Sequence, residues 1–217
     1  MDPPFPWRLV TFDIDGTLTP VHGWKGIAVA FGHLAEFEET TRQFRAHEIG
    51  EDRHLTNLLN IATGHTVAEV EGVLERTPHL AGIAGGLSEL HRDGARTALL
   101  THNPTYVADW YRRTFGFDDA EGVTAQPVRD GRIGPPADVH ADKPAGLRAL
   151  LARFPVPASR VAHVGDGPAD AEVFPLVGGG VALNSLIPEV RRAADLVLET
   201  RDFRDVVDGL AHLVPRR

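Results

Sequence analysis

Short apolar runs that end in polar residues alternate with helix-like segments along most of this chain, and this alternation is the strongest constraint on its fold. The first run covers residues 8–13 and is followed by Gly16, which is typical of a strand that ends in a turn. Further strands are expected at residues 96–101, 161–164, 180–183 and 196–198. Strands separated by helices indicate βαβ units, so the sequence predicts an α/β fold with a parallel sheet.

Helices are expected between these strands. They cover residues 87–93, 104–115, 143–154, 188–193 and 203–213. Pro104 suits the first turn of its helix, because the N–H that proline lacks has no intrahelical partner there. The Asp130-Gly131 pair indicates a hairpin within residues 122–134 that projects from the sheet.

Residues 24–78 differ from the rest of the chain because they show helical spacing and no expected strand. Apolar residues recur at this spacing, as in Leu55, Leu58, Leu59 and Ala62. A capping box at residues 66–69 predicts the start of another helix. We therefore expect a separate helical lobe at residues 21–79, inserted into a discontinuous α/β core formed by residues 1–20 and 80–217.

The composition fits one sizeable core and restricts the partners. The 217 residues include 22 Lys+Arg against 30 Asp+Glu, a formal net charge of −8, which disfavours nonspecific binding to nucleic acid or anionic membrane. Residues 1–8 lack a basic segment followed by an apolar run, and no stretch has the length and hydrophobicity of a membrane span. Without cysteine the chain has no disulfide or thiolate metal site, and a cytoplasmic location is expected.

Carboxylates gather at the ends of two expected strands. Asp13 and Asp15 follow the first strand, and both can face one cleft if the extended geometry persists through Asp15. The alternative is a turn in which these residues supply backbone geometry only. Asp166 and Asp170 follow the strand at 161–164. Oxygen ligands without cysteine or paired histidine suit Mg²⁺ far better than Zn²⁺.

Two more polar residues are expected at the same edge of the sheet. Thr101 ends another strand, and Lys143, one of only two lysines in the chain, precedes a helix. A hydroxyl donor and an ammonium are the groups expected to hold the oxygens of a phosphate. His163 lies inside a buried strand and is expected to be structural.

These four motifs, at residues 13–17, Thr101, Lys143 and residues 165–170, appear in the order found in the haloacid dehalogenase (HAD) superfamily. The chain resembles the phosphatases of that superfamily, and within them the phosphoserine phosphatase-like branch, over nearly its whole length. The resemblance implies a Rossmann-like parallel sheet flanked by helices, with an inserted helical cap. It also implies a Mg²⁺-dependent phosphatase that hydrolyses a small phosphorylated metabolite through an aspartyl phosphate.

The resemblance further implies a role for each motif residue. Asp13 is the nucleophile, and Asp15 protonates the leaving oxygen and then deprotonates the attacking water. Mg²⁺ is bound by the Asp13 and Asp166 carboxylates and by the backbone carbonyl of Asp15. Asp170 supports this metal site. Thr101 and Lys143 hold the transferring phosphoryl group. His102 is a further candidate for phosphate binding, because it adjoins Thr101 at the strand end.

The cap side of the site departs from phosphoserine phosphatases. Those enzymes carry an acidic residue for the substrate's amine shortly after the first motif, whereas residues 20–25 contain no carboxylate. A gapless alignment places Thr56 where their arginine holds the substrate's carboxylate, with Arg53 one helical turn away. We therefore expect phosphoserine to be a poor substrate. The candidate substrate contacts on this side are His22, Trp24, Lys25 and Arg53.

Three other functions stay open at this point, and one of them is phosphoserine phosphatase itself. A phosphotransferase would pass the phosphate from Asp13 to an alcohol instead of water, and the sequence does not distinguish it from a hydrolase. A noncatalytic binding protein would keep the fold, although the presence of Asp13, Asp15, Lys143 and Asp166 together favours an enzyme. The oligomeric state, monomer or homodimer, also stays open.

Overall fold

A six-stranded parallel sheet forms the centre of the computed structural model, which describes residues 5–123 and 126–216. The strands follow the order β3-β2-β1-β6-β7-β8. They are β1 (Leu9–Phe12), β2 (Arg96–Pro104), β3 (Asp119–Val123), β6 (Val161–Gly165), β7 (Gly179–Leu183) and β8 (Leu196–Leu198). Since β2 and β3 lie on one side of β1 and β6 to β8 on the other, a crevice is expected at the carboxyl end of β1. The predicted α/β fold is confirmed.

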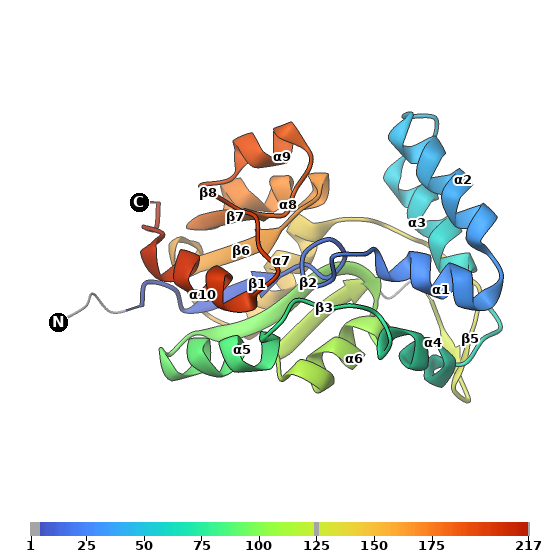
Figure 1. Cartoon of the computed structure of the whole chain (residues 1–217), viewed down its shortest axis with the longest axis horizontal. Helices are drawn as coiled ribbons and strands as arrows, with labels where there is room; N and C mark the ends of the chain where they lie inside the picture. The colour runs from blue at the N-terminus through green and yellow to red at the C-terminus, as the bar shows by residue number, and fades with distance from the viewer. Residues whose placement is uncertain (1–4, 124–125, 217) are drawn as a thin grey trace.

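Helices cover both faces of this sheet (Figure 1). One face carries α5 (Ile83–Arg92), α6 (Thr105–Phe115) and α10 (Phe203–His212), and the other α7 (Lys143–Arg153), α8 (Pro168–Val173) and α9 (Pro188–Ala193). Two short 3₁₀ helices are η1 (Ala158–Arg160) and η2 (Phe174–Leu176). Side chains of β1 alternate between the two faces: Leu9 belongs to the apolar cluster around Leu147, whereas Phe12 packs on Phe203 with ring centroids 5.2 Å apart.

Four more helices lie together beyond the carboxyl end of β1 (Figure 1). They are α1 (Gly23–Phe31), α2 (Leu34–Arg45), α3 (Glu51–Asn60) and α4 (Val67–Leu74). The expected capping box begins α4: the Thr66 hydroxyl accepts the Glu69 N–H at 3.2 Å, and the Glu69 carboxylate accepts the Thr66 N–H at 2.7 Å. None of the helices described is long and apolar enough to cross a membrane. Residues 1–4, part of the N-terminal segment considered above, lie outside the described residues.

The expected hairpin is present as a separate two-stranded sheet of β4 (Val128–Arg129) and β5 (Arg132–Ile133). Its turn residues Asp130 and Gly131 both have positive φ, 47° and 76°, as a tight hairpin turn requires. The hairpin is hydrogen-bonded to the loop between α3 and α4, through Gly64 N–H to the Ile133 carbonyl and Val67 N–H to the Gly131 carbonyl. It therefore packs with the four helices, although it follows the core strands in sequence.

Two local predictions are wrong. β2 continues to Pro104, so this residue ends a strand and precedes α6 instead of lying in the first helical turn. β3 was not expected, because acidic residues and Gly122 are poor strand formers. It pairs with β2 at the edge of the sheet, and Asp119 and Glu121 bind the Arg153 guanidinium of α7 at 2.6 Å each.

Candidate active site

The first motif forms a compact turn directly after β1. The carbonyl of Ile14 accepts the N–H groups of residues 17–19, and Gly16 donates its N–H to the Thr19 carbonyl. Gly16 has a φ of 83°, and a Cβ on this residue would overlap the Asp166 carboxylate. Glycine is therefore required both for the backbone conformation and for the close approach of the two loops.

The loop after β6 is held by side chains from three directions. The carboxylate of Asp170, in the first turn of α8, accepts the N–H groups of Asp166 at 3.0 Å and Gly167 at 2.9 Å. The Ser185 hydroxyl donates to the Asp166 carbonyl at 2.6 Å, and the Thr17 hydroxyl donates to the Asp166 carboxylate at 3.2 Å. Both the backbone and the side chain of Asp166 are thus fixed.

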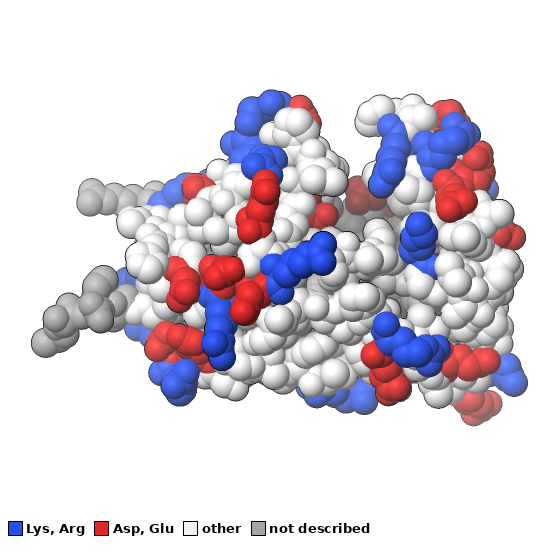
Figure 2. Space-filling view, viewed as in Figure 1, with Lys and Arg blue, Asp and Glu red and all other residues white. Residues whose placement is uncertain are grey.

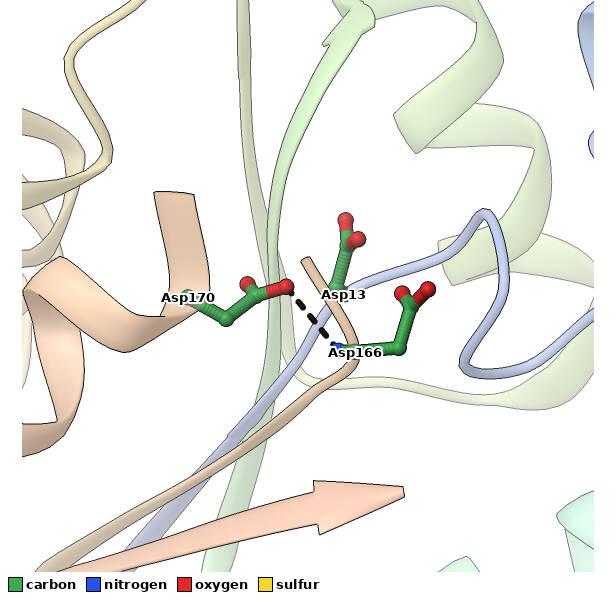
Figure 3. A group of neighbouring side chains, drawn as sticks. All are labelled: Asp13, Asp166 and Asp170. Atoms are coloured by element: carbon green, nitrogen blue, oxygen red, sulfur yellow. Dashed lines mark hydrogen bonds between the residues drawn. The ribbon is translucent and has the colours of Figure 1, made fainter. Parts of the chain in front are cut away.

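These loops bring three carboxylates and one ammonium together. One oxygen each from Asp13, Asp166 and Asp170 lie within 4.8 Å of one another. The Asp13 and Asp166 carboxylates point to the same side, whereas that of Asp170 is directed at the backbone of Asp166 (Figure 3). Lys143 Nζ lies 3.0 Å from Asp13 Oδ1 and 2.5 Å from Asp170 Oδ1. With all four groups ionised, the cluster has an excess of two negative charges.

Asp170 binds donors with both of its oxygens. Oδ1 is bound by Lys143 and by His163 Nε2 at 2.9 Å, while Oδ2 accepts the two loop N–H groups. The fully buried His163 is itself held by the Thr11 hydroxyl, 2.8 Å from its Nδ1. The strong acceptor positions of Asp170 are therefore used within the protein. His163 is buried as expected, and its ring also contacts the carboxylate cluster.

Burial and charge set the protonation of the cluster. Desolvation, reinforced by repulsion from Asp13 and Asp170, raises the pKa of Asp166 to about 8. Burial also raises the pKa of Asp13, against the attraction of Lys143. Burial by itself would raise the pKa of Asp170, but Lys143 and His163 hold it well below its usual range. Burial by itself would lower the pKa of Lys143, but the carboxylates of Asp13 and Asp170 raise this pKa instead. Lys143 and Asp170 are therefore a stable ion pair, whereas ionisation of Asp13 and Asp166 together calls for an added cation.

The carboxylate of Asp15 lies outside this cluster, because β1 ends at Phe12 and the extended geometry does not persist. Its Oδ1 accepts the Gly23 N–H at 2.5 Å and lies 3.6 Å from His22 Nδ1. Its Oδ2 accepts a hydrogen bond from Asn103 Nδ2 at 2.9 Å. Asp15 is thus held between the start of α1 and the end of β2, apart from Lys143.

Asn103 is a site residue that the sequence did not reveal. The expected strand ended at Thr101, but β2 continues to Pro104, and residues two apart in a strand point to the same side. Asn103 Nδ2 lies 3.0 Å from Thr101 Oγ, and Trp24 Nε1 donates to Asn103 Oδ1 at 3.0 Å. A strand predicted to extend past Thr101 would have indicated Asn103, because residues 101 and 103 are two apart and face the same side.

The other predicted residues lie around the site at different depths. His102 Nδ1 lies 3.1 Å from a carboxylate oxygen of Glu51 in α3, and its buried Nε2 has no hydrogen-bond partner among the described residues. His102 and Lys143 line a cavity of about 550 Å³. Lys25 and Arg53 are exposed, and neither is paired with a carboxylate of residues 5–123 or 126–216.

Comparison with known proteins connects this arrangement to a family. Residues 7–178 match the haloacid dehalogenase-like hydrolases. The chain belongs to this family. A solved structure described as a phospho-aspartyl intermediate analogue of phosphoserine phosphatase superposes with a TM-score of 0.78 and 22% identity, over 94% of this chain and 98% of that chain. The predicted resemblance to the HAD superfamily and to its phosphoserine phosphatase-like branch is confirmed.

Two curated relatives show how far the similarity extends in sequence. A phosphoserine phosphatase of Haemophilus influenzae is 23% identical over 200 residues, which cover 90% of this chain and 63% of that protein. A phosphoglycolate phosphatase of Archaeoglobus fulgidus is 27% identical over 106 residues, which cover 47% of this chain and 48% of that protein. The matches thus span about half to two thirds of the length of these relatives.

Proposed function

We propose that this HAD-like hydrolase is a Mg²⁺-dependent phosphomonoester hydrolase in which Asp13 is the nucleophile. The observation that carries the proposal is the Asp13 carboxylate, at the carboxyl end of the central strand, 3.0 Å from the buried Lys143 ammonium. A carboxylate approaches a phosphate dianion only where fixed positive charge offsets their repulsion. Similarity to two kinds of phosphatase supports the same chemistry.

The residues at this site fit a magnesium ion. The candidate ligands are all oxygens, the ionised cluster has an excess of two negative charges, and the raised pKa of Asp166 favours a cation in place of its proton. Asp13 and Asp166 would hold the ion with their carboxylates and Asp15 with its backbone carbonyl, while Asp170 supports the loop. When bound, the ion would supply positive charge against the phosphoryl oxygens.

In the proposed reaction an Asp13 oxygen attacks phosphorus, the bond from phosphorus to the leaving oxygen breaks, and an aspartyl phosphate forms. Asp15 gives its proton to the leaving oxygen, then takes one from the water that releases inorganic phosphate. Asp15 lies apart from Lys143 and is bound by N–H donors instead. This difference supports Asp13 as the nucleophile and Asp15 as the acid and base. The Lys143 ammonium and the Thr101 hydroxyl would hold the phosphoryl oxygens.

We further propose that α1–α4 form a cap that admits a small phosphorylated metabolite. A recess separates the α2–α3 end of the molecule from the α8–α9 end (Figure 2). His22 and Gly23, at the start of α1, lie against Asp15. These contacts support a cap whose α1 end covers the leaving-group side of the site. The proposed substrate is a phosphorylated small acid, sugar or alcohol, hydrolysed in the cytoplasm.

Hydrolysis of 4-nitrophenyl phosphate tests the proposal. Activity should require Mg²⁺ and should be abolished by EDTA, and Asp13→Asn should remove turnover while the melting temperature stays near that of the wild type. Asp15→Asn should slow turnover by roughly 10² to 10⁴. Acid quenching during turnover should leave phosphate covalently bound to the wild-type chain only. Turnover by Asp13→Asn, or full activity without divalent metal, would contradict the proposal.

A further inference from the structure

We propose that Asn103 and Trp24 are positioning residues for phosphoryl transfer, and that Trp24 acts through Asn103. The inference rests on the proposed function and adds two residues outside the four motifs. Both side chains are buried, with 6% of Asn103 and 2% of Trp24 exposed. Trp24 lies in α1 and Asn103 in β2, so their hydrogen bond connects the helices beyond the sheet to the end of a central strand.

The indole of Trp24 determines which way the Asn103 amide faces. An indole N–H can only donate, so its 3.0 Å hydrogen bond to Asn103 requires the amide oxygen on that side. The amide NH₂ then faces the oxygens of Asp15 and Thr101, at 2.9 and 3.0 Å. A flipped amide would set two N–H donors against each other and an oxygen against the Asp15 carboxylate. Trp24 therefore selects the orientation that serves both groups.

The first group that Asn103 positions is the Thr101 hydroxyl. Thr101 Oγ accepts from Asn103 Nδ2 at 3.0 Å and from the Asn103 backbone N–H at 3.2 Å. A hydroxyl has two acceptor positions and one proton, so two incoming hydrogen bonds leave its O–H to donate elsewhere. Asn103 thus turns Thr101 into a donor, as a phosphoryl oxygen requires.

The second group is the Asp15 carboxylate. The other Nδ2 proton of Asn103 binds Asp15 Oδ2, while the Gly23 N–H binds Oδ1. With one donor on each oxygen, the plane of the carboxylate is fixed, and proton transfer to a leaving oxygen depends on such alignment. The two protons of one amide therefore orient both the group that binds the phosphate and the group that protonates the leaving oxygen.

The dependence on the leaving group separates positioning from a purely structural role. Phenyl phosphate and 4-nitrophenyl phosphate have similar shapes, but phenol leaves poorly without a proton whereas 4-nitrophenolate leaves readily. We expect Trp24→Phe to lower kcat/KM for phenyl phosphate by about tenfold and Asn103→Leu by about 10², the lower end of an acid catalyst's contribution. Both losses should be several times smaller for 4-nitrophenyl phosphate. Trp24→Phe should cause no further loss in the Asn103→Leu background.

The matched control is Trp7→Phe. Trp7 is fully buried and donates its indole N–H to the Leu210 carbonyl at 2.8 Å, so this variant loses the same kind of hydrogen bond away from the site. Its melting temperature should fall about as much as that of Trp24→Phe, and its ratio of kcat/KM between the two substrates should stay that of the wild type. Asn103→Asp, which keeps the shape of the side chain but lacks the amide protons, should repeat the Asn103→Leu pattern.

Two results would overturn the inference alone: equal losses for both substrates in the Trp24 and Asn103 variants, or a further loss from Trp24→Phe in the Asn103→Leu background. A wild-type protein that hydrolyses neither substrate would instead refute the proposed function, and this inference with it. The activity of the wild type thus distinguishes the two failures.

Discussion

Lys143 and Asp170 form a buried ion pair, with 2.5 Å between Nζ and Oδ1 and exposed side-chain fractions of 3% and 1%. The same ammonium lies 3.0 Å from Asp13 Oδ1. One lysine therefore joins the residue after β1 to the starts of α7 and α8, and it supplies the positive charge closest to the proposed nucleophile.

Lys143→Arg should lower kcat/KM for 4-nitrophenyl phosphate by about 10² or more, although the charge is kept. A planar guanidinium is larger than an ammonium and cannot take its place between Asp13 and Asp170 without moving one of them. Arg148→Lys is the control, since Arg148 lies in the same helix with 68% of its side chain exposed. Its activity should stay within about twofold of the wild type. Near-normal kinetics of Lys143→Arg would show that only its charge matters.

The positions of the motif residues could be predicted from sequence because they depend on a general property of parallel sheets. Asp13 and Asp166 each follow a strand, Thr101 lies near the end of β2, and the carboxyl ends of parallel strands share one edge. The strand patterns that precede them are apolar and short, so their ends were placed to within a few residues.

Other parts of the site depend on packing that local patterns do not encode. The contact of His163 with Asp170 requires α8 to lie against β6, and the contact of Trp24 with Asn103 requires α1 to lie against the end of β2. β3 likewise has a sequence unfavourable for a strand and forms as an edge strand beside β2, with Arg153 holding its acidic residues.

Magnesium binding should strengthen with pH. Burial raises the pKa of Asp166 from its ordinary value of 3.8 to about 8. The folded protein thus holds this proton more tightly than the unfolded chain, so protonation of Asp166 adds to the free energy of unfolding. This contribution is fully present below about pH 4 and is lost as the pH rises through 8. A cation that replaces the proton should bind about tenfold more tightly per pH unit between pH 6 and 8, then level off.

Calorimetric titration of the protein with MgCl₂ at pH 6, 7, 8 and 9 measures this dependence. Proton release should be detected in the lower part of the range by repeating the titration in buffers of different ionisation enthalpy. The rise in melting temperature caused by Mg²⁺ should grow over the same interval. An affinity that is constant from pH 6 to 8 would contradict the protonation of this carboxylate.

Gly16→Ala should damage both the fold and the metal site, and Gly116→Ala should damage the fold only. Both glycines have positive φ, 83° and 91°, where a Cβ costs roughly 1–2 kcal/mol of stability. A Cβ at Gly16 would meet the Asp166 carboxylate, whereas a Cβ at Gly116 would meet nothing within 4 Å. Chemical denaturation should show losses in both variants, but only Gly16→Ala should bind Mg²⁺ more weakly, by about tenfold or more. If Gly16→Ala bound Mg²⁺ as tightly as the wild type, the close approach of Gly16 to Asp166 would not position the metal site.

Phosphoserine should be a poor substrate compared with a phosphorylated acid that lacks an amine. A closed site removes the water around the substrate's ammonium, which then needs an opposite charge or costs several kcal/mol to bury. Residues 20–25 offer no carboxylate, and that of Glu51 already lies 3.1 Å from His102 Nδ1. The exposed cations Lys25 and Arg53 favour a second anionic group instead.

The measurement is kcat/KM for phosphoserine, phosphoglycolate, glycerol phosphates and sugar phosphates at one Mg²⁺ concentration. At least one substrate without an amine should exceed phosphoserine by about tenfold, which corresponds to 1.4 kcal/mol of transition-state binding. Arg53→Gln and Lys25→Gln should reduce the preference for the phosphorylated acid and leave the glycerol phosphates nearly unchanged, because only the acid carries a second anionic group. A tenfold lead for phosphoserine would mean that the ammonium has a partner in the closed site, and the segment at residues 20–25 would then not determine the substrate.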